Sequence, residues 1–255
     1  AAYAAVGSSA VVGPIVIALS LSRSRPERPD PLIRVWCNAV LGAAGVREDV
    51  AGLENLPSGT CVLVCNHQSN FDAPFVFARL PKHIRFVAKQ ELYRIPIFGA
   101  AIKAMGNIRV ERTGSDGDRK RIEAAIEQVR TRTSILFFAE GTRSTDGKLR
   151  PFKKGAAVLA IDAQVPLVPV AVAGAHEITP KGGLWVHSGR PLVLRVGKPI
   201  PTTGLGRGDR DTLTRQAHEA EILHAANPEY RQHLKSLHLT MMAASMLISL
   251  AGIYL

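Results

Sequence analysis

The sequence predicts an α/β domain with a mostly parallel central sheet flanked by helices. Short apolar runs alternate with longer amphipathic segments along the middle of the chain, which is the pattern of β-α units in a parallel sheet. In the runs over residues 61–65 and 135–139 the apolar residues are consecutive, as in strands that are buried on both faces. The chain has 255 residues, of which 46% are hydrophobic and 21% charged. This composition excludes a disordered chain, and the length suffices for one substantial core.

The first part of the domain is predicted to contain three strands and two helices. Residues 61–65 (CVLVC) form a continuous apolar run, and residues 84–88 and 108–110 resemble it. Each run therefore predicts a buried strand. The amphipathic segments between them predict helices over residues 72–79 and 96–105.

The second part continues the alternation. Residues 135–139 (ILFFA), 167–173 and 192–196 again have the apolar character of buried strands. The segments around these runs are longer and amphipathic, so they predict further helices that cover the sheet. The predicted helices span residues 118–132, 155–163 and 210–223.

The two ends of the chain differ from the middle. Residues 1–22 carry no charged side chain and lead into a proline-rich, arginine-rich linker. As a helix this run would be roughly 33 Å long, enough to span a bilayer core of about 30 Å, although its glycines and proline equally suit a buried or interfacial hairpin helix. Residues 239–255 are also uncharged, and they predict a helix that contacts either the membrane or a protein partner. The sequence thus divides into a membrane-associating segment with a linker (1–50), a catalytic-type domain (51–223) and an extension (224–255).

Positive charge is concentrated in one stretch. Residues 79–154 contain 18 Lys and Arg against 8 Asp and Glu, which accounts for +10 of the net charge of +11. Such an excess suits nucleic acid, an anionic bilayer or a phosphorylated small molecule. The chain has no recognisable nucleic-acid motif, and its 5% of aromatic residues offers few stacking platforms. A nucleic-acid partner is therefore not expected.

A histidine and a carboxylate follow the first predicted strand. His67 lies just beyond the strand, and Asp72 comes five residues later across a turn into a helix. A carboxylate so placed can bind the imidazole Nδ1 and leave Nε2 as a general base, the arrangement of a catalytic triad without its serine. The alternative is structural, because Ser69-x-x-Asp72 is also a capping box that would begin the helix.

The cysteines offer a second nucleophile to consider. The chain has three cysteines, an odd number that cannot form a closed disulfide framework. Cys65 and His67 fall on one face of an extended strand and could form a Cys-His pair, but a cysteine that closes an apolar run is typically an inert packing residue. A metal site on Cys61, Cys65 and His67 fails because four strand residues separate the two sulfurs by roughly 13 Å. No metal is expected.

Basic and glycine-containing loops follow two further strands. Arg112 lies at the end of the strand over 108–110, and Glu140-Gly141-Thr142-Arg143 directly follows ILFFA. Arginines brought to one sheet edge beside a loop that exposes main-chain N–H groups form a phosphate clamp. The alternative is a solvated basic loop, which the local concentration of positive charge disfavours.

At this point the chain resembles the glycerolipid acyltransferases, and most closely the 1-acyl-glycerol-3-phosphate (lysophosphatidate) acyltransferases. Four ordered motifs carry the resemblance, which covers roughly residues 32–223. One departure is Ala139, where the family usually has proline. The motifs read Asn66-His67-x4-Asp72, Gly106-x-Ile108-x-Val110-x-Arg112, Phe138-x-Glu140-Gly141-Thr142-Arg143-Ser144 and Val165-Pro166-Leu167-Val168-Pro169-Val170.

The resemblance implies a reaction and a role for each motif residue. His67 would be the general base that takes the proton from the sn-2 hydroxyl of lysophosphatidate, with Asp72 supporting the imidazole. The hydroxyl would attack an acyl thioester, carried by CoA or by an acyl carrier protein, to give phosphatidate without a covalent acyl-enzyme, a metal or a bound cofactor. Main-chain N–H groups around Gly141 would stabilise the oxyanion. Lys89 would add positive potential, and the residues implied to bind the glycerol phosphate are Arg112, Glu140, Gly141, Thr142 and Arg143.

The resemblance also implies a membrane partner. In the family a pair of N-terminal helices lies in one leaflet, and residues 1–22 and 32–44 would be that pair here. The arginines after residue 22 place the catalytic domain on the cytoplasmic or matrix side by the positive-inside rule. The alternative function is a non-catalytic acyltransferase-like subunit that binds lipid within a membrane complex, with residues 239–255 contacting its protein partner.

Overall fold

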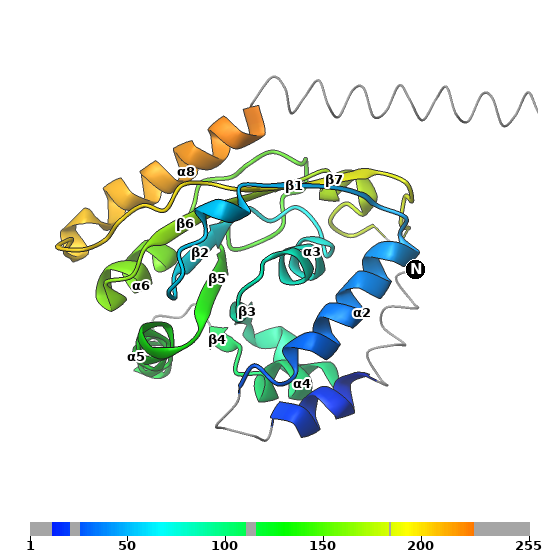
Figure 1. Cartoon of the computed structure of the whole chain (residues 1–255), viewed down its shortest axis with the longest axis horizontal. Coiled ribbons are helices and arrows are strands. Elements are labelled where there is room, and N and C mark those ends of the chain that lie inside the picture. The colour runs from blue at the N-terminus through cyan, green and yellow to red at the C-terminus, as the bar shows by residue number, and fades with distance from the viewer. Residues whose placement is uncertain (1–11, 21–25, 111–115, 184, 227–255) are drawn as a thin grey trace, which may run out of the picture.

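The protein forms a seven-stranded sheet with helices on both faces (Figure 1). The computed structural model describes residues 12–20, 26–110, 116–183 and 185–226. The strand order is β1-β7-β6-β2-β5-β3-β4. The strands are β1 (Arg47–Ala51), β2 (Val62–Cys65), β3 (Ile84–Lys89), β4 (Ile108–Val110), β5 (Ser134–Phe138), β6 (Leu167–Ala173) and β7 (Pro191–Val196).

The sheet is mostly parallel, which confirms the predicted fold class. β6, β2, β5, β3 and β4 run in the same direction, so their carboxyl ends meet at one edge. β7 pairs with β6 in the antiparallel sense, and β1 pairs in parallel with β7. β1 is not among the predicted strands, because its residues Arg-Glu-Asp-Val-Ala form no apolar run. Ligands of open α/β sheets bind beyond the carboxyl ends of the strands, so the shared edge is where a site is expected.

Helices cover both faces of the sheet. They are α2 (Asp30–Ala43), α3 (Asp72–Arg79), α4 (Phe98–Ala104), α5 (Asp116–Thr131), α6 (Gly155–Ala163), α7 (Ala175–Ile178) and α8 (Arg210–Ala226). Three short 3-10 turns are η1 (Leu53–Asn55), η2 (Gln90–Arg94) and η3 (Arg207–Asp209). Figure 1 shows α2 and α3 on one side of the sheet and α5, α6 and α8 on the other.

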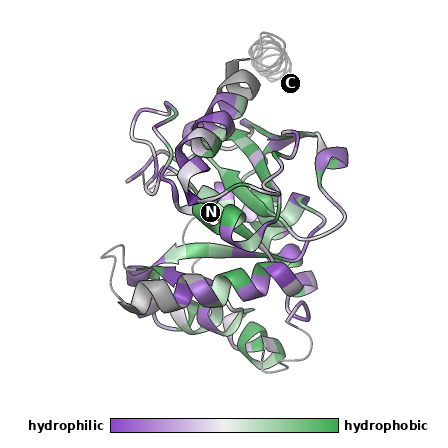
Figure 2. Cartoon of the chain, turned by 90° about the vertical axis from the view of Figure 1, so that its left-hand side faces the viewer, coloured by the Kyte–Doolittle hydropathy of each residue, from purple (hydrophilic) through white to green (hydrophobic). Residues whose placement is uncertain are grey.

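The core has two layers because successive strand residues point to opposite faces. On β2, Leu63 and Cys65 pack with α2 and α3, whereas Val62 and Val64 pack with α5, α6 and α8. All four side chains are almost fully buried. Figure 2 accordingly colours the central strands mostly green and the surrounding helices in a mixture of green and purple. This two-sided burial explains why the strands read as continuous apolar runs.

Part of the N-terminal segment lies within the described residues. Residues 12–20 form a helix whose Val16 is buried in the core, and its Gly13 lies against Ile97, which precedes α4. In the described parts of the chain, no helix combines the length and apolarity that crossing a membrane needs. The rest of the predicted segment 1–22 and all of 239–255 lie outside the described residues.

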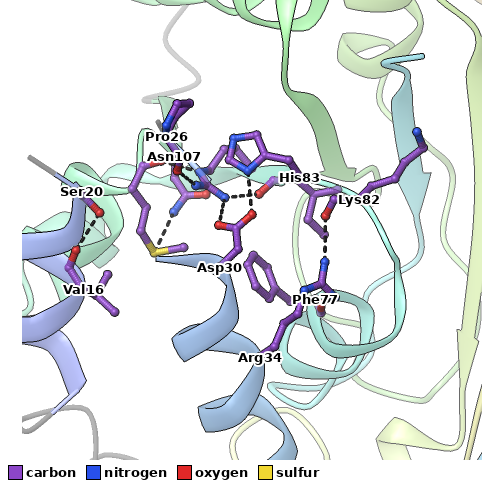
Figure 3. Close-up of polar contacts among 12 residues, drawn as sticks. Val16, Ser20, Pro26, Asp30, Arg34, Phe77, Lys82, His83 and Asn107 are labelled. Carbon is purple, nitrogen blue, oxygen red and sulfur yellow. Dashed lines mark hydrogen bonds and ion pairs between the residues drawn. The ribbon is translucent and has the colours of Figure 1, made fainter. Parts of the chain in front are cut away.

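A buried ionic network joins α2 to the sheet (Figure 3). Asp30 accepts from Arg85 Nη1 at 2.9 Å through Oδ1, and its Oδ2 lies 2.6 Å from His83 Nδ1. Arg85 is 1% exposed and also donates from Nη2 to the carbonyl of Pro26 at 2.6 Å. Burying a guanidinium is costly unless it is paired and fully hydrogen-bonded. The network therefore fixes the start of α2 against β3.

Asp30→Asn is expected to destabilise the protein by about 3 kcal/mol, because it leaves the buried Arg85 without its counter-charge. The matched control is Asp211→Asn, since Asp211 pairs with Lys154 where both side chains are more than half exposed. That substitution should leave the free energy of unfolding almost unchanged, because exposed ion pairs contribute little. Urea unfolding gives both free energies, and equal losses would contradict the role of the network.

Candidate active site

The catalytic-type loop begins where β2 ends, and the side chain of Asn66 fixes its start. Asn66 Nδ2 donates to the carbonyl of Val172 at 2.7 Å, and the Val172 N–H donates back to Asn66 Oδ1 at 2.8 Å. The amide thus prolongs the pairing of β2 with β6 by one residue. His67 then leaves the sheet at the edge where the parallel strands end.

His67 and Asp72 form the pair that the sequence predicts. His67 Nδ1 lies 2.7 Å from Asp72 Oδ2, and Asp72 is fully buried. The same carboxylate oxygen accepts from the main-chain N–H groups of Gln68 and Ser69 at 2.7 and 2.8 Å. Asp72 therefore holds the imidazole and also shapes the turn into α3. The Ser69 hydroxyl donates to the carbonyl of Thr179, so the capping box of the alternative interpretation is only half formed.

The imidazole is held by aromatic stacking as well as by Asp72. Its ring stacks on Phe138 with centroids 4.1 Å apart and an interplanar angle of 18°, and Phe86 stacks on Phe138 in turn. The His67 side chain remains 21% exposed, and Nε2 makes no hydrogen bond to any described residue. With the proton on Nδ1 directed at the carboxylate, Nε2 offers a lone pair to a reactant.

Glu140 joins the two main predicted motifs. Its Oε1 accepts from the His67 main-chain N–H at 2.6 Å, and its Oε2 accepts from the Arg150 N–H at 3.2 Å. The Ser144 N–H donates to the His67 carbonyl at 2.8 Å. Both main-chain groups of His67 are thus bound to the loop after β5. Burial raises the pKa of Glu140 to about 7, while the His67 and Arg150 N–H donors act in the opposite direction.

Glu140 is expected to make the protein less stable as the pH rises from about 4.5 to about 7. The unfolded chain loses this proton near the ordinary value of 4.5, whereas the folded protein keeps it until about pH 7. The folded state binds more protons in this interval, so its stability falls with rising pH. After allowance for partial solvent screening the loss is about 2 kcal/mol. Urea unfolding of wild type and of the non-titrating Glu140→Gln should show the steeper fall in wild type; equal slopes would contradict the assignment.

The turn after Glu140 requires glycine. Gly141 has φ +75°, and a Cβ there would lie 2.8 Å from Lys153 Cε. Its own N–H donates to the carbonyl of Phe138, so the expected oxyanion donor cannot be Gly141 itself. The next two N–H groups, of Thr142 and Arg143, have no acceptor among the described residues. They are the main-chain donors that this loop leaves available.

Basic side chains gather around the same loop. Lys153 lies over Gly141, and Lys181 Nζ donates to Thr142 Oγ1 at 3.2 Å. Arg143 is half-buried, and Lys89 ends β3 with an exposed side chain. Arg112, the remaining predicted phosphate ligand, lies outside the described residues. The arrangement suits an anionic group beside His67.

Some of these contacts were not predicted from the sequence. Lys181 is 39 residues from Thr142 along the chain, and no local pattern marks it. Phe138 is the stacking partner of His67 and precedes the Glu-Gly motif by two residues. Its position at the end of β5, the strand next to β2, would have signalled proximity if the strand order had been known.

Cys65 does not act on the imidazole in this structure. Its thiol is fully buried and its nearest polar contact is Asn66 Oδ1 at 3.8 Å. Burial raises the pKa of Cys65 well above its ordinary value, and the nearby carboxylates Glu221, Asp72 and Glu140 raise it further. A neutral, buried thiol is a packing residue.

Comparisons with known proteins show which proteins this chain is similar to. A protein-family model described as Acyltransferase matches residues 47–173. The chain is 36% identical to 1-acyl-sn-glycerol-3-phosphate acyltransferase alpha of Ovis aries, over 78% of this chain and 70% of the sheep protein. It is also 36% identical to the chloroplastic 1-acyl-sn-glycerol-3-phosphate acyltransferase BAT2 of Brassica napus, over 60% of this chain and 45% of the plant protein.

A solved structure is similar as well. The crystal structure of the 1-acyl-sn-glycerophosphate acyltransferase PlsC from Thermotoga maritima superposes with a TM-score of 0.67 at 26% identity, covering 82% of this chain and 85% of that one. The chain spans less than half the length of some relatives: 45% of the Brassica napus protein, and 43% of the chloroplastic 1-acyl-sn-glycerol-3-phosphate acyltransferase LPAT1 of Arabidopsis thaliana, to which it is 35% identical.

Proposed function

The chain belongs to the acyltransferase family, and on that premise we propose that it moves an acyl group from an acyl thioester to the sn-2 hydroxyl of lysophosphatidate. The observation that carries this proposal is the His67–Asp72 pair, with an unengaged Nε2, joined through Glu140 to a basic loop. One end of the combined site can remove a proton, and the other can bind a phosphate. Lysophosphatidate carries both a free hydroxyl and a phosphate, so it matches the site.

The chemistry follows from the orientation of the imidazole. His67 Nε2 takes the proton from the acceptor hydroxyl as its oxygen attacks the thioester carbonyl carbon. The tetrahedral intermediate then collapses, the C–S bond breaks, and the imidazolium returns the proton to the departing thiolate. Asp72 stabilises the imidazolium and keeps the ring in the productive tautomer. The acyl donor is a thioester of CoA or of an acyl carrier protein, since both present the same reacting group.

The loop after β5 divides its roles between main chain and side chains. We assign the N–H groups of Thr142 and Arg143 to the developing oxyanion or to the phosphate, because positive φ at Gly141 turns the chain there. The side chains of Arg143, Lys153 and Lys181 supply positive charge for the phosphate. Both oxygens of Glu140 are taken by main-chain donors, so its part in acceptor binding is to hold this loop against His67.

The test is a thiol-release assay with detergent-purified protein, lysophosphatidate and acyl-CoA or acyl carrier protein. Wild type should release thiol, and Arg143→Ala should raise the KM for lysophosphatidate by about 10- to 100-fold through loss of a charge-assisted phosphate contact. The control is Arg207→Ala, since Arg207 is an exposed arginine paired with Asp162 before α8, and its KM should not change. Absence of thiol release from folded wild type would refute the proposal and favour the non-catalytic lipid-binding alternative.

We further propose that the protein works on a bilayer surface, with the catalytic domain on the cytoplasmic or matrix side. Both lysophosphatidate and phosphatidate reside in membranes. Large apolar side chains are exposed on the N-terminal helix, on α2 and around η2, and Trp185 is 80% exposed in the loop that also carries Lys181. An exposed indole beside basic residues is typical of contact with the lipid headgroup region. The apolar side chains are Ile15, Val35, Leu92, Ile95 and Ile97.

Tryptophan fluorescence is expected to report this contact. The chain has two tryptophans, and Trp36 packs against the core from α2. Vesicles containing phosphatidate should shift Trp185 emission to shorter wavelength, and Trp185→Phe should abolish most of the shift while Trp36 remains as the internal reference. Neutral phosphatidylcholine vesicles should give a weaker response because they lack the anionic charge. An identical response in wild type and Trp185→Phe would contradict contact at this loop.

A further inference from the structure

Glu221 is a buried glutamate on α8 that takes no part in the proposed acyl transfer. Glu221 is 1% exposed, yet neither of its carboxylate oxygens has a hydrogen-bond partner among the described residues. It follows Leu213 and Ala217 at intervals of four on one face of α8, and both of these are ordinary packing residues. A carboxyl buried without partners costs stability, so its presence calls for an explanation.

The neighbours of Glu221 place it directly behind the catalytic-type loop. Together with Asn66, Gln68 and Gly147 it lines a cavity of about 80 Å³. The Asn66 main-chain N–H favours its charged form, but makes no hydrogen bond to it in this structure. Burial nevertheless raises the pKa of Glu221 well above its usual value, and the charge of Glu140 raises it further. Burial therefore favours the neutral form of the carboxyl, which lies beside a cavity.

The main-chain N–H groups of the loop after β2 are bound by buried carboxyls. The N–H of His67 donates to Glu140, and those of Gln68 and Ser69 both donate to Asp72. Three consecutive N–H groups are thus held by buried carboxyls from two different elements. Asn66, the first residue of the loop, lines the same cavity as the third carboxyl, Glu221, and its N–H favours the charged form of that carboxyl. Hydrogen bonds that are long or poorly aligned in a substrate-free enzyme often tighten when substrates bind.

We propose that Glu221 is a positioning residue, whose carboxyl accepts a hydrogen bond from the Asn66 N–H when substrates bind and so fixes the chain from which His67 projects. This inference rests on the proposed acyltransferase function. Glu221 touches no reacting atom; it acts through the main chain of residues 66 and 67. The substitution of an apolar residue should therefore improve packing but impair the reaction, because small displacements of a catalytic group lower the rate strongly.

The test compares Glu221→Met with Glu221→Gln in the thiol-release assay. Methionine removes the unpartnered carboxyl and cannot accept the hydrogen bond, so Glu221→Met should keep or raise Tm while kcat falls roughly 10-fold and KM changes less than about twofold. Glutamine keeps an acceptor oxygen and should restore kcat. The matched control on the same face of α8 is Leu213→Ala, which should lower Tm through lost packing and leave kcat unchanged.

Amide hydrogen exchange provides a readout that does not depend on turnover. With lysophosphatidate bound, the Asn66 N–H should be protected in wild type and in Glu221→Gln, but should exchange faster in Glu221→Met. If wild type releases no thiol yet shows this difference, the proposed function falls while the positioning contact stands. Wild-type kcat in Glu221→Met, or equal impairment of the methionine and glutamine variants, would overturn the positioning role.

Discussion

Replacing His67 with alanine is expected to lower kcat by about three orders of magnitude without unfolding the protein. The imidazole is the group in the described site whose nitrogen is both oriented by a carboxylate and free to accept a proton. Without it the acceptor hydroxyl must lose its proton to water, although the phosphate and oxyanion donors remain. The KM for lysophosphatidate should change little, because the phosphate contacts come from a different loop.

The measurement is thiol release at saturating substrates, with Tm recorded for each protein. The ring of His67 is partly exposed and stacks on Phe138, so its removal should shift Tm by only a few degrees. The control is His187→Ala, since His187 has an exposed side chain in the loop after α7. A His67→Ala enzyme that retains more than about a tenth of wild-type kcat would remove His67 from the role of general base.

The fold was largely predictable from sequence because both faces of the sheet are buried. Five of the six predicted strands lie in the interior of the sheet, and their apolar runs record that burial; the sixth, β4, ends the sheet and still buries Ile108. β1 is different: it lies at one edge, carries Arg47, Glu48 and Asp49, and is defined by pairing with β7. A strand that is held by backbone pairing at a sheet edge need not show a periodic pattern of hydrophobic residues. The sequence of β1 therefore has no pattern that predicts a strand.

The candidate site was predictable only where the chemistry is local. The five-residue spacing of His67 and Asp72 is enough to suggest their contact, and the structure confirms it at 2.7 Å. The contacts of Glu140 with His67 and of Lys181 with Thr142 join residues 73 and 39 positions apart. Such contacts depend on strand order and on main-chain donors, neither of which a side-chain pattern encodes. The same reason hides Glu221, whose partner is a backbone N–H.

Asp72→Asn is expected to lower kcat by roughly 10²- to 10⁴-fold while preserving most of the fold. Asparagine has the same shape, and its carbonyl oxygen can take the place of Oδ2, which accepts from the N–H groups of Gln68 and Ser69 and also binds His67 Nδ1. The turn into α3 and the orientation of the imidazole should therefore survive. The amide carries no charge, however, so it no longer stabilises the imidazolium that forms when Nε2 takes the proton from the acceptor hydroxyl.

Two comparisons separate this loss of charge from damage to the turn. Asp72→Ala removes the acceptor for all three donors, so it should lower Tm more than Asp72→Asn and lose at least as much kcat. The double variant His67→Ala with Asp72→Asn should be no slower than His67→Ala alone, because Asp72 acts on the reaction through the imidazole and residues that work as a unit are not additive. A double variant slower by the product of the two single losses would mean that Asp72 contributes independently of His67, and the pair would then not be the catalytic unit.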